Sequence, residues 1–88
     1  MEFRWNDWNL RHVEKHGVTP AEAERVVRMA VRPFPREIGE GKFLAWGQGQ
    51  GGRFVQVIYV EEMTGTILII HARPLSEKEK HLWRRMTR

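Results

Sequence analysis

The stretch RFVQVIYVEEMTGTILIIHAR, residues 53–73, decides the fold class of this chain. It holds two nearly continuous apolar runs, separated by a segment that contains the pair Thr64-Gly65. β-Branched and aromatic residues favour strands, and a Thr-Gly pair between two such runs favours a tight turn. The stretch therefore predicts an antiparallel hairpin with strands at 53–61 and 66–73. Apolar runs without alternating polar residues are typical of strands that are covered on both faces of the sheet. We therefore expect the helices to cover one face, and a partner protein is a candidate to cover the other.

Further strands are predicted just before this hairpin. Residues 43–46, Phe-Leu-Ala-Trp, form another apolar run, and the glycine-rich segment 47–52 can turn the chain into the hairpin. This segment is not a phosphate-binding loop, because no Gly-Lys-Ser/Thr ends it and a strand rather than a helix follows. A shorter strand is expected near 36–39. The middle of the chain is therefore predicted to be an antiparallel meander of three to four strands.

A helix is predicted directly before the strands. The run TPAE, residues 19–22, places a hydroxyl at the N-cap, proline at the first helical position and the glutamate of a capping box at the third. Apolar residues then recur at helical spacing, which predicts an amphipathic helix from Pro20 to about Val31. Pro33 is expected to stop it.

The N-terminal part of the chain predicts a short strand and another helix. Residues 2–5 alternate charged with aromatic side chains, which suits a strand with one buried face. Asn6 or Asp7 can cap a helix that runs to about His16, and Gly17 can take the left-handed conformation that ends helices. A histidine in that place is typical of a side chain that interacts with the carbonyl groups at a helix end.

A C-terminal helix is predicted from a second capping box, SEKE at residues 76–79, and begins at about Glu77. Its apolar face consists of Leu82, Trp83 and Met86, which are expected to dock on the sheet while cations face outward. These cations are Lys78, Lys80, Arg84, Arg85 and Arg88.

The net charge of +4 lies entirely in this C-terminal part of the chain. Residues 73–88 contain six basic and two acidic side chains, whereas residues 1–72 contain nine of each. A local basic surface favours a polyanion such as RNA, or an acidic protein partner. The simpler alternative is a solvated helix that aids solubility.

The composition is that of one small domain of the α+β class, covering residues 1–88. The absence of cysteine excludes disulfides, thiolate zinc sites and cysteine nucleophiles, and it suits a reducing compartment. His12 and His16 share a helix face, but no acidic or cysteine ligand stands at a recognisable spacing, so neither a metal nor another cofactor is expected.

No apolar run is long enough for a bilayer or a signal peptide, so we expect a cytoplasmic protein without membrane contact. A chain this short buries a small core, to which a homodimer or a partner could add.

Three motifs, taken in order, resemble those of a known protein family. They are His16-Gly17-Val18 after a tryptophan-containing opening, the strand end Ile69-Ile70-His71-Ala72-Arg73, and Glu79-Lys80 followed by Trp83. With these motifs at compatible spacings, nearly the whole chain resembles the BrnT-like toxins of bacterial and archaeal type II toxin–antitoxin modules. It departs from the family at His12, where an asparagine is usual, and at Gly41, where the acid of a Glu-Arg pair is usual.

The resemblance implies a RelE-like fold, in which two N-terminal helices pack on a small antiparallel sheet and a further helix follows. It also implies an endoribonuclease toxin that cleaves RNA without metal and is held inactive by a cognate BrnA-like antitoxin with a DNA-binding domain. The rival interpretation is a non-catalytic module of the same fold that binds RNA or an antitoxin. The missing acid at Gly41 favours the module, whereas His71 with Arg73 favours the enzyme.

Cleavage of RNA through its 2′-hydroxyl needs a proton acceptor, a cation beside the phosphate and a proton donor. On an extended strand, His71 and Arg73 are expected to point to the same face, together with Ile67 and Ile69. Arg53 is expected near them on the paired strand if the hairpin register centres on its Thr-Gly turn. The simpler interpretation makes His71 a half-buried, hydrogen-bonded side chain.

The resemblance extends the candidate site to the start of a middle strand and to the C-terminal helix. Lys42 stands where the family has the basic member of its Glu-Arg pair, and Glu79 belongs to the last motif. The predicted catalytic set is His71, Arg73, Lys42, Arg53 and Glu79. RNA binding is assigned to Lys80, Arg84, Arg85 and Trp83. In the simpler alternative, Arg73 only pairs with Glu79 or Glu77 at the helix start, and Trp83 belongs to the core.

Overall fold

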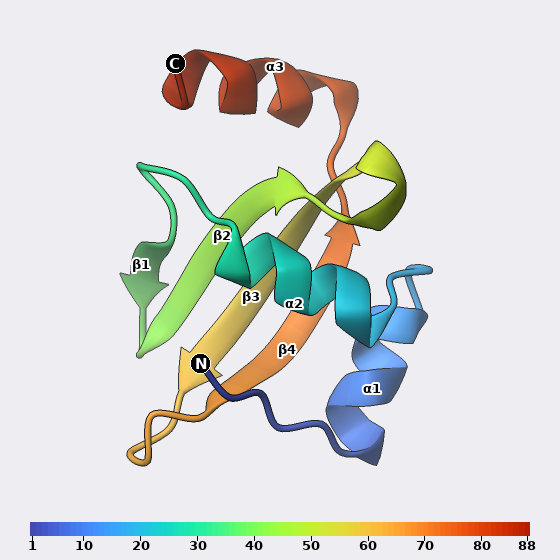
Figure 1. Ribbon diagram of the computed structural model, residues 1–88, viewed down its shortest axis with the longest axis vertical. Helices are drawn as coiled ribbons and strands as arrows, with labels where there is room; N and C mark the ends of the chain where they lie inside the picture. Colours follow the sequence, from blue (N-terminus) through green and yellow to red (C-terminus); the bar gives the residue numbers. More distant parts are fainter.

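Four antiparallel strands and three helices make up the protein, whose computed structural model describes all of residues 1–88 (Figure 1). Along the chain, the elements are α1 (Asp7–Glu14), α2 (Pro20–Arg28), β1 (Arg36–Gly39), β2 (Lys42–Gln48), the short 3-10 turn η1 (Gln50–Gly52), β3 (Phe54–Glu61), β4 (Ile67–Pro74) and α3 (Glu77–Met86). The strands lie in the order β1-β2-β3-β4, each antiparallel to the next. The predicted α+β class and meander are therefore confirmed. No helix combines the length and the apolar character needed to span a membrane.

The predicted N-terminal strand is reduced to a single bridge. Phe3 lies parallel to Ile67 at the start of β4. The Arg4 N–H donates to the Ile67 carbonyl over 2.9 Å, and the Ile67 N–H donates to the Glu2 carbonyl over 2.8 Å. These two bonds hold the N-terminus against the sheet without forming a regular strand.

Helix α1 begins with a reciprocal cap between two asparagines. The Asn6 side chain accepts from the Asn9 N–H, and the Asn9 side chain accepts from the Asn6 N–H, which satisfies two backbone donors at the helix start. The helix ends at Glu14, two residues before the predicted end at His16. Gly17 then has a φ of +74°, in the left-handed region, as its place after the helix predicted.

Helix α2 begins at Pro20 as predicted, because the Thr19 hydroxyl accepts from the Glu22 N–H over 3.1 Å. Only this half of the predicted capping box exists, since the Glu22 carboxylate binds Arg53 instead. The helix ends at Arg28 rather than near Val31. The chain beyond it leads into a proline, which lacks an N–H and disfavours helical geometry in the residue before it.

The core lies between the two N-terminal helices and one face of the sheet. Helix α1 packs on β4, and α2 packs on β2 and β3 (Figure 1). Helix residues such as Val13 and Val26 are at most 1% exposed there. Their partners on the sheet are Ala45, Val55, Val57, Tyr59, Ile67, Ile69 and Ala72. This face confirms that helices cover one side of the predicted hairpin.

The other face of the sheet, called the open face below, meets α3 at one end, where Phe34 also packs against Trp46 with ring centroids 5.5 Å apart. Because side chains alternate along a strand, the open face receives the residues between the core positions. Its apolar members are half-exposed, in contrast to the core: Leu44, Ile58, Val60, Leu68 and Ile70. No second layer of this chain covers them.

A β-bulge at Ile70 reverses the alternation along β4. Ile69 pairs with Tyr59, but His71 already pairs with Ile58, so Ile70 is an extra residue without a partner of its own. Ile69 and Ala72 consequently both face the core, three residues apart. The prediction that His71 and Arg73 share a face with Ile67 and Ile69 is therefore wrong. The bulge directs them to the open face instead.

Candidate functional site

The corner between β4 and α3 is built around one bidentate ion pair. Arg73 donates through both terminal nitrogens to the Glu79 carboxylate, over 2.8 and 2.7 Å. Glu79 also completes the predicted capping box, since it accepts from the Ser76 N–H over 2.8 Å while the Ser76 hydroxyl accepts from the Glu79 N–H. The hydrogen bonds from Arg73, followed by those of Ser76, lower the pKa of Glu79 to about 2. Glu79 is therefore an anion at any physiological pH.

A chain of polar side chains runs from this corner across the open face. Arg73 donates to the Gln56 side-chain oxygen over 3.2 Å, and the Trp46 indole N–H donates to the same oxygen over 2.9 Å. Gln56 is only 8% exposed. Side chains of β3 and α3 thus fix the guanidinium of Arg73, and Trp46 of β2 holds Gln56 in turn. The hydrogen bond to Glu79 raises the pKa of Arg73.

His71 lies next to Arg73 on β4, and its imidazole is half-buried. Burial lowers the pKa of His71 below its ordinary value of 6.5, and the nearby charges of His16, Arg73 and His12 lower it further. The imidazole is therefore neutral near pH 7 and able to accept a proton.

A second imidazole joins the site from the end of α1. The ring of His16 lies with its centroid 5.6 Å from that of His71, in an edge-to-face arrangement. The His16 side chain does not form the expected bond to a helix carbonyl; only its backbone N–H donates to one, that of Val13, over 3.2 Å. Sequence reasoning missed this contact because it joins two distant elements, and no local pattern marks it. His12, one turn earlier, contacts the Trp8 carbonyl through Nδ1 over 2.7 Å. No group of three or more histidine or acidic side chains is placed to hold a metal ion.

Arg53, predicted to lie beside His71, is bound elsewhere. Its guanidinium donates twice to Glu22, over 2.8 and 2.7 Å, and once to the Gly17 carbonyl. The Glu22 side chain is 4% exposed, so the pair ties α2 to the start of β3. A Cβ at Gly49 would lie 2.3 Å from the Glu22 Cγ, so this arrangement needs glycine there. Arg53 therefore shares no partner with Arg73.

Lys42 lies on the open face but far from the corner. It pairs with Val60 across β2 and β3, four residues before Trp46. Four residues of strand span about 13 Å, so Lys42 cannot join Arg73 on one phosphate. The structure therefore brings His71, Arg73 and Glu79 together and leaves Lys42 and Arg53 apart.

Helix α3 is anchored by a single aromatic side chain. The Trp83 ring lies 5.0 Å from that of Phe54, and its indole N–H donates to the Trp46 carbonyl over 3.0 Å. Leu82, expected to dock with it, is 38% exposed. The ring of Trp83 therefore packs within the fold. Its predicted role in stacking on an RNA base stays a prediction.

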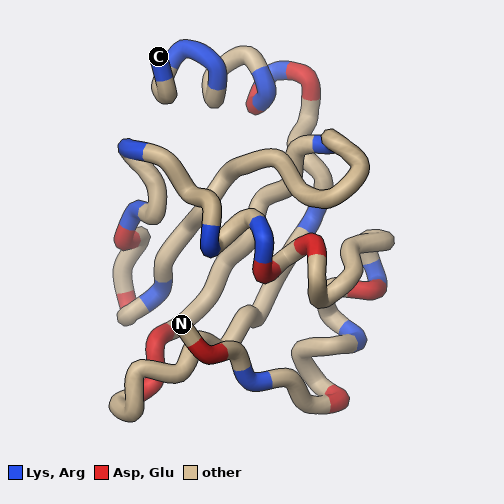
Figure 2. The backbone as a smooth tube through the Cα atoms, in the orientation of Figure 1, with Lys and Arg blue, Asp and Glu red and all other residues tan.

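The cations of α3 form the basic end of the molecule. Figure 2 shows Lys and Arg along α3 after the acidic residues at its start, whereas basic and acidic residues are mixed over the rest of the chain. Lys80 pairs with Glu77 over 3.0 Å, and the Arg84 guanidinium lies 5.6 Å from the centroid of the Phe54 ring. Arg85 is exposed and forms no ion pair. Arg85 is therefore free to bind a polyanion, whereas Lys80 and Arg84 already have contacts within the chain.

Comparison with protein-family models, with curated proteins and with solved structures finds no match to this chain. A function must therefore be inferred from the side chains at the corner. They combine a neutral imidazole, a second imidazole and a guanidinium held in place by an anion. Such a group can bind a phosphate and transfer protons beside it.

Proposed function

We propose that this protein is a BrnT-like toxin of a type II toxin–antitoxin module, with a RelE-like fold, that cleaves RNA at the corner of β4 and α3. The observation that carries the proposal is that His71 lies beside Arg73 on β4, with its ring centroid 5.6 Å from that of His16 at the end of α1. The bulge at Ile70 and the end of α1 bring these three side chains together. All three are groups that phosphodiester cleavage can use without a metal.

The reaction assigns one task to each side chain. Neutral His71 accepts the proton of the 2′-hydroxyl as that oxygen attacks phosphorus, and Arg73 stabilises the negative charge that develops on the phosphate. His16 gives a proton to the departing 5′-oxygen. The products are a 2′,3′-cyclic phosphate and a free 5′-hydroxyl, so all protons and bonds are accounted for.

The ion pair with Glu79 positions Arg73 for this task. A guanidinium has five N–H donors, and the bonds to Glu79, to Gln56 and to the Pro74 carbonyl leave the Nε donor of Arg73 unused. The Arg73 side chain is also 34% exposed, so a phosphate can reach it. Because Glu79 and Gln56 already hold the guanidinium in one orientation, less conformational entropy is lost when it binds the phosphate during the reaction.

The open face and α3 provide a surface along which RNA can lie. Lys42 stands at one end of this face and the corner at the other, with half-exposed aliphatic side chains between them. Beyond the corner lie the cations of α3, Lys80, Arg84 and Arg85, which attract the phosphate backbone (Figure 2). A cognate BrnA-like antitoxin that blocked this surface would hold the toxin inactive.

The second candidate function is a non-catalytic module of the same fold that binds RNA or an antitoxin. It is favoured by the neutralisation of Arg73, whose charge is already matched by Glu79. Gly41 supports it too, because the family has an acid there. In this case the same surface binds without cleaving.

Incubation of the purified chain with defined RNAs in the presence of EDTA separates the two functions. The toxin should cleave at discrete positions and leave 2′,3′-cyclic phosphate ends, and its overproduction should arrest growth. The variant Arg4→Ala is the matched control, because Arg4 pairs with Glu62 away from the corner and its loss should leave cleavage unchanged. RNA that is bound but stays intact across a range of sequences would favour the binding module.

A further inference from the structure

The second half of β2 has a free edge. Strand β1 pairs with β2 only from Lys42 to Leu44, whereas β2 continues to Gln48. Prolines at 33 and 35 precede β1, and a proline has no N–H with which to extend the pairing. Residues 45–48 therefore have β3 on one side and no strand on the other. An unpaired edge of this kind is a template for a further strand, and the ring of Phe34 borders it 5.5 Å from that of Trp46.

The backbone groups on this edge point away from β3. The Gly49 N–H donates to the Arg53 carbonyl, on the side of β3. Successive residues of a strand direct their backbone groups to alternate sides, so those of Trp46 and Gln48 face the free edge. The Trp83 indole N–H already uses one of them, the Trp46 carbonyl, over 3.0 Å. The Trp46 N–H and both backbone groups of Gln48 remain for another chain.

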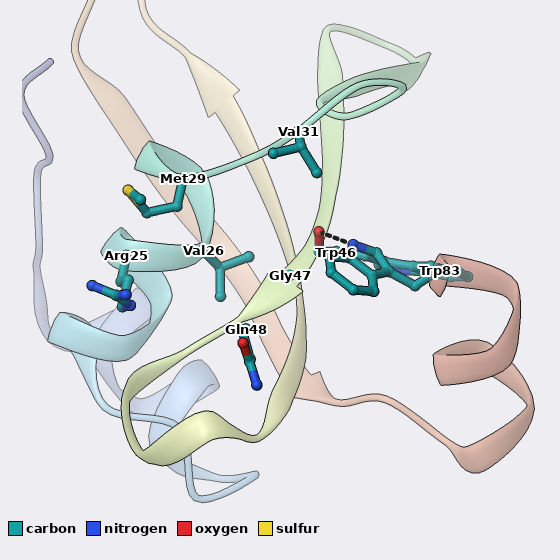
Figure 3. Close-up of a pocket in the computed structure, with 8 residues that line it drawn as sticks. All are labelled: Arg25, Val26, Met29, Val31, Trp46, Gly47, Gln48 and Trp83. Atoms are coloured by element: carbon teal, nitrogen blue, oxygen red, sulfur yellow. Dashed lines mark hydrogen bonds between the residues drawn. The ribbon is translucent and has the colours of Figure 1, made fainter. Parts of the chain in front are cut away.

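An apolar groove of about 220 Å³ lies beside this edge (Figure 3). It is bordered by the end of α2 on one side and by α3 on the other, with Met29, Val31, Trp46 and Trp83 among its lining residues. Met29 is 60% exposed and Val31 is 48% exposed. Large apolar side chains so exposed beside an unpaired strand offer a pocket for a side chain of an added strand.

The charge at this groove is positive and unmatched. Arg25, the charged residue in its lining, is exposed and forms no ion pair. The carboxylate of its neighbour Glu24 is already engaged, by Arg28 over 3.1 Å and by the Trp5 indole N–H over 2.7 Å. No acidic residue lines the groove. The groove therefore complements an acidic group.

We propose that this groove binds an extended acidic segment of a partner protein, which adds a strand to the free edge of β2. The segment's backbone pairs with Trp46 and Gln48, an apolar side chain lies between Val31 and Trp46, and a carboxylate pairs with Arg25. A peptide fits better than RNA, because the edge offers alternating backbone donors and acceptors, whereas RNA binding needs a row of cations. The proposal does not depend on ribonuclease activity.

The test uses isotope-labelled protein and a short synthetic peptide of alternating valine and glutamate, followed by amide and indole NMR shifts. The backbone amides of Trp46 and Gln48 and the indole N–H of Trp83 should shift on titration. Arg25→Glu should weaken binding by about tenfold or more, whereas Arg11→Glu, an equal charge change on α1, should not. A peptide with N-methylated backbone nitrogens should fail to bind. Arg25 is exposed, so its variant should keep the wild-type spectrum elsewhere.

Several outcomes would overturn the proposal. Equal binding of a valine–lysine peptide would remove the acidic requirement. Shifts confined to other strands, or no shifts at all, would remove the free edge as the site. The same shifts produced by a single-stranded RNA, or by raising the protein concentration without peptide, would assign the groove to RNA or to a second copy of the chain.

Discussion

The two faces of the sheet are made from the same strands but differ in character. On the face that α1 and α2 cover, Val57, Ile69 and Ala72 are at most 1% exposed. On the open face, Ile58 is half-exposed, and polar groups such as His71 replace the aliphatic ones. The difference shows that strand alternation separates the packed core from the polar candidate site, and that a single bulge places His71 and Arg73 on the second face.

The largest effect should come from truncating a core residue. Ile69→Ala should lower the free energy of unfolding by about 2–5 kcal/mol, because it leaves a cavity beneath the helices. Ile58→Ala, the matched change on the open face, should cost only about 1 kcal/mol, because its side chain is already partly in water. Urea denaturation of both variants gives the comparison. Equal losses would mean that the open face also carries the fold.

A smaller loss is expected for Arg53→Ala, which tests whether this predicted catalytic residue is structural. Its removal leaves the buried Glu22 carboxylate without its partner, at a cost of about 1–3 kcal/mol. Cleavage per folded molecule should stay unchanged. If the variant kept the wild-type stability but no longer cleaved RNA, Arg53 would have to be assigned to the catalytic site after all.

The helices and the hairpin strands were the easier part to predict, because their signals are local. The cap at Thr19, the box at Ser76 and the turn at Gly65 each lie within a few residues of the element they define. The hairpin strands were correct to within one residue at each end for the same reason. Amphipathic spacing then located the helix face that packs on the sheet.

The open face could be predicted only in part. The run ILII, residues 67–70, has the same apolar character throughout, so nothing in it marks Ile70 as the bulge. Glu22 fits a capping box equally well whether or not a distant arginine takes its carboxylate. The contact of His16 with His71 likewise depends on tertiary packing. The structure brings His71, Arg73 and Glu79 near one another, but the bulge and the tertiary contacts that orient them have no local signal in the sequence.

The pH dependence of stability should distinguish the corner from the core. The pKa of Glu79 is lowered from its ordinary 4.5 to about 2 in the folded chain, so its contribution is complete above pH 4.5 and is lost as the pH falls towards 2. Glu79→Gln should reduce stability by about 1 kcal/mol at pH 7. Unfolding free energies of the two proteins should converge near pH 2. Curves that stay parallel over this range would show that the ion pair adds no stability.

The smallest effect on the fold is expected from α3. Changing Lys80, Arg84 and Arg85 together to alanine should alter stability by no more than about 0.5 kcal/mol. It should weaken RNA binding and reduce the slope of log affinity against log salt by about 2, because fewer counterions are released. A control in which Arg11 on α1 and Lys15, the residue that follows α1, are changed to alanine should keep the wild-type slope. The same slope in all three proteins would exclude α3 from the RNA surface.

The most direct test of the separation between the faces is a cleavage assay with folded variants in EDTA. Arg73→Ala should slow cleavage of a defined RNA by about 100- to 1000-fold, because a preorganised donor is lost. His71→Ala should slow it by about 100- to 10000-fold, because its proton acceptor is lost. Arg53→Ala, on the helix-covered side, should cleave at the wild-type rate per folded molecule. Wild-type cleavage by both the Arg73 and His71 variants would contradict the assignment of the chemistry to the open face.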